Sequence, residues 1–450
     1  MNKHNTRLLV YVILMALTVF TACSSPVGEV VYPEADRHRS LTAAEVTADA
    51  EYLVRIVEET HPAFLDISEF RDLPSSKYDD AKEFFLKSAT NAMTVEDYYL
   101  LACGYTAALG DLHTSIDNLS GGGILPTLFN WKEEGLFIIE SGENPVQSKK
   151  QVTAIGEVKV GDIGAYIDTH MAYENEAGLY YNRSNNVRSK TVLMALGATD
   201  GETAVLNIVS NDGAEQVINV DFVTLAEVGT SQESFGYELI ENDTVLVITA
   251  NLCVKDASWE ETVNYFRKTV TDLGVRKIIF DIRENTGGDS SVWDPFYPLV
   301  NLSETAGDAR IGLIRRHSPL AKQSVYKNLT LQGDYARYTP EYYPVLTSGV
   351  QIKVLVSERT NSSAVLFLSY AKDILLAEVI GNTPRNNLTH FGNPASFTMP
   401  NSHIRGSVST CLWMRYLPVQ DSEGTSANVV DVVVPFGEDA MTYAIERLGQ

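Results

Sequence analysis

Residues 233–450 of this chain predict an α/β fold with a core of parallel βαβ units. Two strand-helix-strand patterns occur there, and their strands are near-continuous apolar runs, typical of parallel strands covered on both faces. A polar stretch with two adjacent glycines, "DIRENTGGDS" (281–290), follows one of these strands. Because ligands bind beyond the carboxyl ends of the strands in such sheets, this stretch is the first candidate for a functional site.

The N-terminus has the pattern of a lipoprotein signal peptide. Basic residues precede an apolar run (8–20) that is short for a membrane span but suits a signal sequence. The run ends in "FTACSS", which resembles a bacterial lipobox, so we expect residues 1–22 to be removed and Cys23 to be lipidated. Residues 23–40 would then be a linker to the cell membrane or outer membrane, outside the cytoplasm. Ordinary signal cleavage is the alternative.

Composition indicates a globular protein and argues against some partners. The 450 residues are 44% hydrophobic and 21% charged, which suits one large core or several smaller ones. The formal net charge of −23 argues against nucleic acid or an anionic membrane surface as the main partner, because both select basic patches.

No pattern for a metal or a cofactor is found. H-E-x-x-H, G-x-x-x-x-G-K-[ST] and G-x-G-x-x-G are absent from the sequence. Cys103, Cys253 and Cys411 are an odd number of widely separated thiols without C-x-x-C spacing, which favours buried structural cysteines over a disulfide framework or a zinc site.

Residues 41–118 predict a small helical domain. A first helix has its apolar residues on one face and ends at "HP" (61–62), and a second covers 79–88. A third begins at Thr94, whose spacing to Asp97 is that of a capping box.

Residues 119–232 predict a β-rich module. Short alternating runs such as "GLFII", "TAVLNIVSNDG" and "QVINVDFV" are separated by Gly, Asn and Asp. We therefore expect mostly strands between Ile124 and Val223.

The first βαβ unit of the core begins with a strand at 244–249 and ends with the strand 275–282. Ser258, with Glu261 three residues later, predicts the start of the intervening helix as a second capping box.

The second βαβ unit brings hydroxyl groups to the edge of the sheet that carries the glycines. A strand at 352–357 is followed by a turn, a helix at about 362–372 and the strand "LLAEVIG". The hydroxyl of Ser362 would stand at the start of this helix, where the helix dipole and unpaired N–H groups favour developing negative charge. A nucleophile and an oxyanion hole need this arrangement, but serine is also an ordinary N-cap, so both interpretations stay open here.

Four segments, in the same order along the chain, resemble motifs of the S41 serine peptidases, the family of tail-specific and tricorn-like proteases. "GDLHTSI" resembles G-D-x-H-T, "IIFDIRENTGGDS" resembles D-x-R-x-N-x-G-G, "VLVSERTNSSA" resembles T-x-S, and "FTMPNSHI" resembles L-P-N-S. The resemblance runs from about residue 42 to the C-terminus. It implies a ClpP/crotonase-like core, an N-terminal helical part and a middle module that is PDZ-like in many members. "QVTAIGEVKVGDI" is similar to the PDZ-like A-I-N-G-x-x-V but lacks the Asn.

The resemblance also implies a serine-type peptidase that forms an acyl-enzyme on peptide or protein substrates without a cofactor. It makes Ser362 the nucleophile and His113 the general base. The oxyanion hole would be formed by the backbone N–H of Ser363 and that of Gly288 or Gly287, with Gly288 preferred. Side chains beside these glycines would then brace their loop: Asp281, Arg283 and Asn285.

The third catalytic residue is an acid that would orient the histidine. In tricorn-like members it precedes a G-V-x-P-D segment, to which "SEGTSANVVDVVV" is similar, so Glu423 is the first candidate and Asp421 the second. Asp111 is interpreted as a turn residue, because side chains so close in sequence to His113 seldom face it.

The chain departs from the family in three places. The tail-specific branch uses a lysine where "GNTPRNNLTHFG" has Arg385 and Asn387, and arginine cannot serve as a neutral base. Leu112 replaces a serine of the tricorn-like branch, and Val365 replaces a glutamate that follows many family nucleophiles.

Alternatives to these assignments remain. Ser363 is the second candidate for the nucleophile, and two other histidines are candidates for the base: His390 and His403. A catalytically inactive peptide- or ligand-binding module on the same scaffold is the alternative function, because fold does not settle function.

Overall fold

The computed structural model describes residues 37–70, 74–119, 123–140, 146–224, 233–297, 311–339, 349–415 and 429–448. The predicted signal peptide, Cys23 and most of the predicted linker lie outside these residues, and so do Glu423 and Asp421. None of the helices in the described ranges combines the length and apolar character needed to cross a bilayer.

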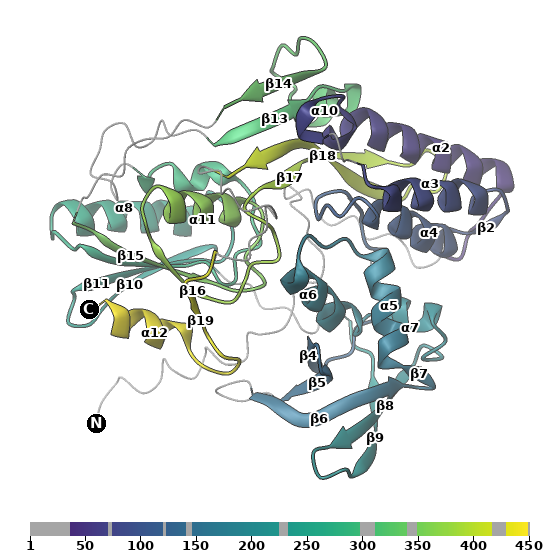
Figure 1. Cartoon of the computed structure of the whole chain (residues 1–450), viewed down its shortest axis with the longest axis horizontal. Helices are drawn as coiled ribbons and strands as arrows, with labels where there is room; N and C mark the ends of the chain where they lie inside the picture. The colour runs from purple at the N-terminus through teal and green to yellow at the C-terminus, as the bar shows by residue number, and fades with distance from the viewer. Residues whose placement is uncertain are drawn as a thin grey trace.

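A mixed, mainly parallel sheet forms the core, and both predicted βαβ units are part of it (Figure 1). Its strands, in spatial order, are β10 (Phe235–Ile240), β11 (Val245–Ala250), β12 (Lys277–Asp281), β15 (Gln351–Val356), β16 (Glu378–Gly381) and β19 (Val432–Val433). All neighbours pair in parallel except β10 and β11. The crossover helices are α8 (Ala257–Thr271) and α11 (Ser363–Asp373). They pack on one face, and α12 (Ala440–Arg447) covers the other.

Helix α8 has a different cap from the predicted one. Asp256 occupies the N-cap position and accepts the N–H of Trp259 at 3.0 Å. Ser258 lies inside the first turn and donates its hydroxyl to Asp256 at 2.7 Å, while Glu261 accepts from Tyr237. The capping-box prediction was therefore wrong, because Asp and Ser are comparable N-caps and both precede the same apolar pattern.

A second sheet, which is antiparallel, lies beside the core (Figure 1). It contains β14 (Tyr335–Tyr338), β13 (Gly312–Arg316), β18 (Arg405–Met414) and β17 (His390–Thr398), with the short strand β3 (Ser115–Ile116) paired to β18. Sequence analysis did not identify this sheet, because β13 and β14 come from a part of the chain far from β17 and β18, and the two parts carry no joint local pattern. Helix α10 (Pro319–Ser324) follows β13.

The N-terminal helices pack against this second sheet. They are α2 (Ala43–Thr60), α3 (Ser76–Ser88) and α4 (Val95–Ala107), and β1 (Ser40–Leu41) pairs with β2 (Met93–Thr94) beside them. The predicted end of α2 at "HP" and the capping box at the start of α4 are confirmed. Leu53 and Tyr98 share one hydrophobic cluster with Phe397 and Val408 of the sheet. The helices are therefore held against strands that lie between β16 and β19 in sequence.

The middle module contains both strands and helices. Its sheet runs β4 (Leu128–Lys132), β5 (Gly135–Glu140), β6 (Val146–Ile155), β8 (Thr203–Ser210) and β9 (Glu215–Asp221), with β7 (Val158–Lys159) on β6. Three helices were missed by the prediction of mostly strands: α5 (Val160–His170), α6 (Glu176–Asn186) and α7 (Lys190–Ala195). Val160, Ile163 and Ile167 have helical spacing and pack on the sheet. The PDZ-like assignment and the domain boundaries stay predictions.

Candidate active site

The carboxyl ends of β12 and β15 bring the glycine loop and the serine turn together, as expected from the parallel pairing of the two strands. The N–H of Asn361 donates to the carbonyl oxygen of Asn285 at 2.9 Å, and Thr360 Oγ1 donates to the carbonyl oxygen of Ile282 at 2.9 Å. The two segments are thus joined by hydrogen bonds immediately before Ser362.

Ser362 stands at the N-cap position of α11 but does not cap the helix. Its backbone has φ +53° and ψ −121°, a conformation that costs a non-glycine residue about 1–3 kcal/mol. Its Oγ lies 2.9 Å from Nε2 of His113. Gly287 stands directly against it, since a Cβ on Gly287 would lie 2.6 Å from the Ser362 Cβ. The hydroxyl therefore faces the His113 ring and does not cap the helix.

His113 is held in the loop after α4 by the strand β18 and by Asp111. Its N–H donates to Asp111 Oδ1 at 2.9 Å, and its carbonyl oxygen accepts from Ser407 Oγ at 2.9 Å. Asp111 thus makes the turn contact predicted for it, but the expectation that its side chain would not face His113 was wrong. Asp111 Oδ1 also lies 3.8 Å from Nδ1 of the His113 ring, so the carboxylate does approach the ring.

Asp111 is buried in a polar cluster with His61. His61 Nδ1 accepts the N–H of Ala63 at 3.2 Å, so its Nε2 carries the proton and donates to Asp111 Oδ2 at 3.1 Å. Thr114 Oγ1 donates to the same carboxylate at 2.6 Å. Burial acts to raise the pKa of Asp111, but the hydrogen bond from His61 and the electrostatic attraction of the neighbouring imidazoles outweigh it, and the pKa lies well below its usual range.

The alternative histidines and the alternative serine have other surroundings. The His390 ring is stacked beside the His113 ring at 5.9 Å between centroids, and its Nδ1 donates to the carbonyl oxygen of Asn387 at 2.9 Å. Burial, with the nearby charge of His113, lowers the pKa of His390 to about 3. His403 is exposed at a turn, and Ser363 Oγ donates to the carbonyl oxygen of Gly288 at 2.5 Å.

The backbone amides of the glycine loop are not equivalent. The N–H of Gly287 donates to Asn285 Oδ1 at 2.9 Å. Within the described residues, no acceptor is found for the N–H of Gly288 or of Ser363, the residues that follow Gly287 and Ser362. These two amides are therefore available to a ligand, and Gly288 is the better candidate of the glycine pair.

The predicted bracing of this loop is confirmed. Asn285 Nδ2 donates to the carbonyl oxygen of Ala250 at 3.2 Å. Arg283 donates to both carboxylate oxygens of Asp281, at 2.9 and 2.7 Å. Gly288 has φ +128°, and a Cβ there would lie 2.4 Å from the carbonyl oxygen of Cys253. Only glycine fits this position without a shift of the backbone.

Two residues that sequence analysis missed complete the surroundings of Ser362. Asn386 Oδ1 accepts the N–H of Ser362 at 2.7 Å, and Asn386 Nδ2 donates to Glu174 Oε1 at 2.7 Å. Glu174 lies between α5 and α6, and its carboxylate, Asp111 and a ring nitrogen of His113 all lie within 4.8 Å of one another. Asn386 falls in the segment compared above with a family lysine, which could have drawn attention to it. No sequence pattern distinguishes Glu174.

The family positions at which this chain differs have structural roles here. The Arg385 guanidinium lies over the ring of Tyr181, 4.4 Å from its centroid, and the N–H of Asn387 donates to Glu174. Val365 is buried in the hydrophobic core. The predicted acids Glu423 and Asp421 lie outside the described residues, so Asp111 and Glu174 are the described carboxylates placed near His113.

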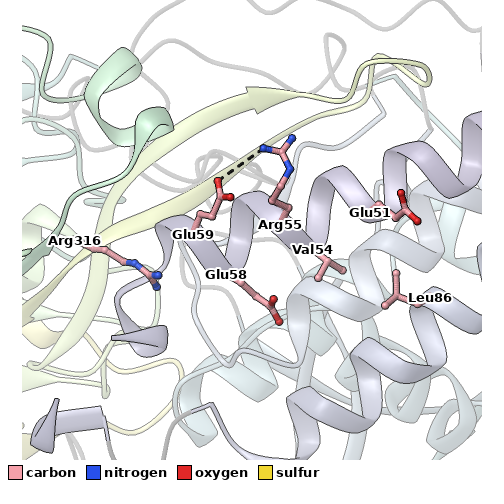
Figure 2. Close-up of a pocket in the computed structure, with 7 residues that line it drawn as sticks. All are labelled: Glu51, Val54, Arg55, Glu58, Glu59, Leu86 and Arg316. Atoms are coloured by element: carbon pink, nitrogen blue, oxygen red, sulfur yellow. Dashed lines mark ion pairs between the residues drawn. The ribbon is translucent and has the colours of Figure 1, made fainter. Parts of the chain in front are cut away.

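A hollow of about 380 Å³ lies elsewhere, along α2 (Figure 2). It is lined by Glu51, Val54, Arg55, Glu58, Glu59, Leu86 and Arg316. The charges there are mutually compensated in part, since Arg55 pairs with Glu59 at 3.8 Å and Lys82 pairs with Glu58 at 2.5 Å. None of the residues singled out by the sequence lines this hollow.

Comparison with known proteins identifies the fold. No protein-family model and no curated protein matches the chain. Mature CPAF aligns over 90% of this chain and 95% of that chain with 12% identity and a TM-score of 0.58. CPAF complexed with lactacystin aligns over 90% of this chain and 97% of that chain, with 12% identity and a TM-score of 0.57. The chain has the fold of the S41 serine peptidases.

The photosystem II D1 C-terminal processing protease aligns more weakly. It covers 88% of this chain and 98% of that chain with 11% identity and a TM-score of 0.43. The predicted α/β class with an S41 core is confirmed by the CPAF alignments. At 12% identity they establish the fold, and the chemistry of the site rests on the contacts described above.

Proposed function

We propose that the chain is a serine endopeptidase that hydrolyses peptide or protein substrates through an acyl-enzyme. The observation that carries the proposal is the 2.9 Å contact between Ser362 Oγ and His113 Nε2 at the N-terminus of α11. A serine hydroxyl is a poor nucleophile until a base accepts its proton, and this contact supplies the base.

In the proposed reaction, Ser362 Oγ attacks the carbonyl carbon of the scissile bond while His113 Nε2 takes the hydroxyl proton. The carbonyl oxygen becomes an oxyanion, which accepts hydrogen bonds from the N–H groups of Gly288 and Ser363. The peptide C–N bond then breaks as His113 gives its proton to the leaving amine. Water, deprotonated by His113, attacks the resulting ester, and His113 then gives that proton to Ser362 Oγ as the acid product leaves.

This mechanism requires the neutral His113 ring to carry its proton on Nδ1, so that Nε2 can accept. A negative charge near Nδ1 favours that tautomer and stabilises the imidazolium formed during the reaction. Asp111 Oδ1, 3.8 Å from Nδ1, supports this role among the described residues. Glu423, with Asp421 as the alternative, remains the acid proposed from the family resemblance.

Fluorophosphonate labelling tests the proposal directly, because only an activated serine reacts. We expect the wild-type protein to be labelled on Ser362 and the Ser362→Ala variant to remain unlabelled, as read by mass spectrometry of the labelled peptide. Ser363→Ala is the matched control and should still be labelled. A folded wild-type protein that shows neither labelling nor peptide hydrolysis would contradict the proposal and favour a binding module.

We further propose that the mature protein is held outside the cytoplasm by a lipid on Cys23. The lipobox-like "FTACSS" supports this. Membrane affinity grows by about 0.8 kcal/mol for each buried CH₂ group of a lipid chain, so losing the lipid should release the protein. We expect Cys23→Ser to move the protein to the soluble fraction or to block its maturation, as read by membrane fractionation. Unchanged fractionation and processing would rule the anchor out.

A further inference from the structure

A carboxylate of the middle module reaches the catalytic pair. Glu174 lies in the short connection between α5 and α6, and this connection is docked on the loop that follows β16. Glu174 Oε2 accepts the N–H of Asn387 at 2.9 Å, and Asn175 Nδ2 donates to the carbonyl oxygen of Pro384 at 3.0 Å. The middle module is therefore joined to the core by several hydrogen bonds at one place.

The same carboxylate determines how Asn386 is oriented. An asparagine amide can present either its oxygen or its NH₂ group in a given direction. Because Asn386 Nδ2 donates to Glu174 Oε1, its Oδ1 is the atom that faces the N–H of Ser362. If the amide turned over, its NH₂ group would face that N–H, and two donors do not bind each other.

We propose that Glu174 is a positioning residue for the catalytic pair, which acts by fixing the Asn386 amide and, through it, the backbone of Ser362. This inference rests on the proposed function. The backbone of Ser362 is strained, with φ +53°, and such a conformation persists only when its surroundings hold it. The hydrogen bond from the Ser362 N–H is one of the contacts that hold it.

Only the ionised carboxylate of Glu174 can accept both hydrogen bonds and so fix the Asn386 amide. Asp111 and His113 are the titratable groups that face it, and Asn386 and Asn387 face it as neutral donors. Burial raises the pKa of Glu174 to about 7, against the effect of the hydrogen bond from Asn387. Protonation would place an O–H donor against one of these N–H donors. We therefore expect the support for Ser362 to be present above the pKa of Glu174 and to be lost below it.

The test measures the rate constant for fluorophosphonate labelling of Ser362 from about pH 5 to about pH 9. Glu174→Ala should label about 10- to 100-fold more slowly at the alkaline end, because small displacements of a nucleophile have effects of this size. In the wild type, His113 and Glu174 both take up a proton on acidification. A plot of the logarithm of the labelling rate constant against pH should therefore be steeper than the plot for a single protonation. Glu174→Gln keeps the shape of the side chain and should show the slope of a single proton.

Glu176→Gln is the matched control, since Glu176 is an exposed glutamate in the first turn of α6. It should keep the wild-type rate and slope. If the wild type is labelled and both Glu174 variants show the same rate and the same pH slope as the wild type, this inference is overturned while the proposed function stands. If the Glu174 variants label more slowly by the same factor at every pH, with the pH slope unchanged, the role of Glu174 is purely structural and this inference is also overturned. A wild-type protein that does not label at all would instead overturn the proposed function.

Discussion

Ser362→Ala, His113→Ala and the double variant should each lose peptidase activity by about the same factor, on the order of 10⁶ in kcat. The effects should not multiply, because the serine is activated only by transfer of its proton to the histidine. Once either partner is absent, the other has no remaining role in the chemical step. The 2.9 Å contact between Ser362 Oγ and His113 Nε2 is the physical basis of this expectation.

The measurement is the kcat for hydrolysis of a peptide substrate by the three variants, with folding checked by circular dichroism. Ser363→Ala should be far milder, because alanine keeps the backbone N–H that is assigned to the oxyanion hole. It does lose the hydroxyl bonded to the Gly288 carbonyl oxygen. Hydrolysis that survives in Ser362→Ala and disappears in Ser363→Ala would move the nucleophile by one residue. Multiplicative losses in the double variant would show that the two residues act independently.

Asp111→Ala should lower the free energy of unfolding by about 3 kcal/mol or more, because each buried donor left without its acceptor costs about 1–3 kcal/mol. The carboxylate is fully buried and accepts hydrogen bonds from His61, from Thr114 and from the His113 N–H. Removing it leaves three buried donors without their acceptor. The midpoint of denaturant unfolding at about pH 7 measures this loss.

The destabilisation should depend on pH with a definite sign. The pKa of Asp111 is lowered in the folded protein, so its contribution to stability is present above the unfolded value of about 3.9. That contribution is lost as the pH falls toward the folded value. The difference in free energy of unfolding between the wild type and Asp111→Ala should therefore be largest at neutral pH and become smaller in strong acid.

Asp117→Ala provides the control for this prediction. Asp117 is an exposed acid of the same segment and forms a long ion pair with Arg405 at 3.8 Å. Exposed pairs contribute about 0–1 kcal/mol, so this variant should stay close to wild type. A loss from Asp111→Ala as small as that from Asp117→Ala would mean that the Asp111 carboxylate does not stabilise the fold.

The parts of the site that the sequence predicts are those carried by short local patterns. The Gly287–Gly288 pair follows a strand, Ser362 begins a helix, and parallel pairing then places the two at the same edge of the sheet. His113 was assigned from the resemblance of its segment to a family motif. Its position within 2.9 Å of Ser362 depends on a fold that brings residues 249 positions apart together.

The parts that were missed have no local pattern. Glu174 is 212 positions from Asn386 in sequence and meets it only because the middle module docks on the core. His61 was recognised as the end of a helix, and its hydrogen bond to Asp111 follows from the packing of α2 beside the loop after α4. Helix α6 was missed because its buried surface is small, so the chain there has little apolar periodicity.

The attachment of His113 to strand β18 has a consequence for the order in which the proposed site is completed during synthesis. The His113 carbonyl oxygen accepts from Ser407, and Thr114 accepts from the N–H of Ser409. Both serines leave the ribosome after Ser362. Until they do, the base lacks the strand that holds it, and the serine has no partner to remove its proton. On the proposed function, an incomplete or truncated chain is therefore expected to be latent until its own folding is complete.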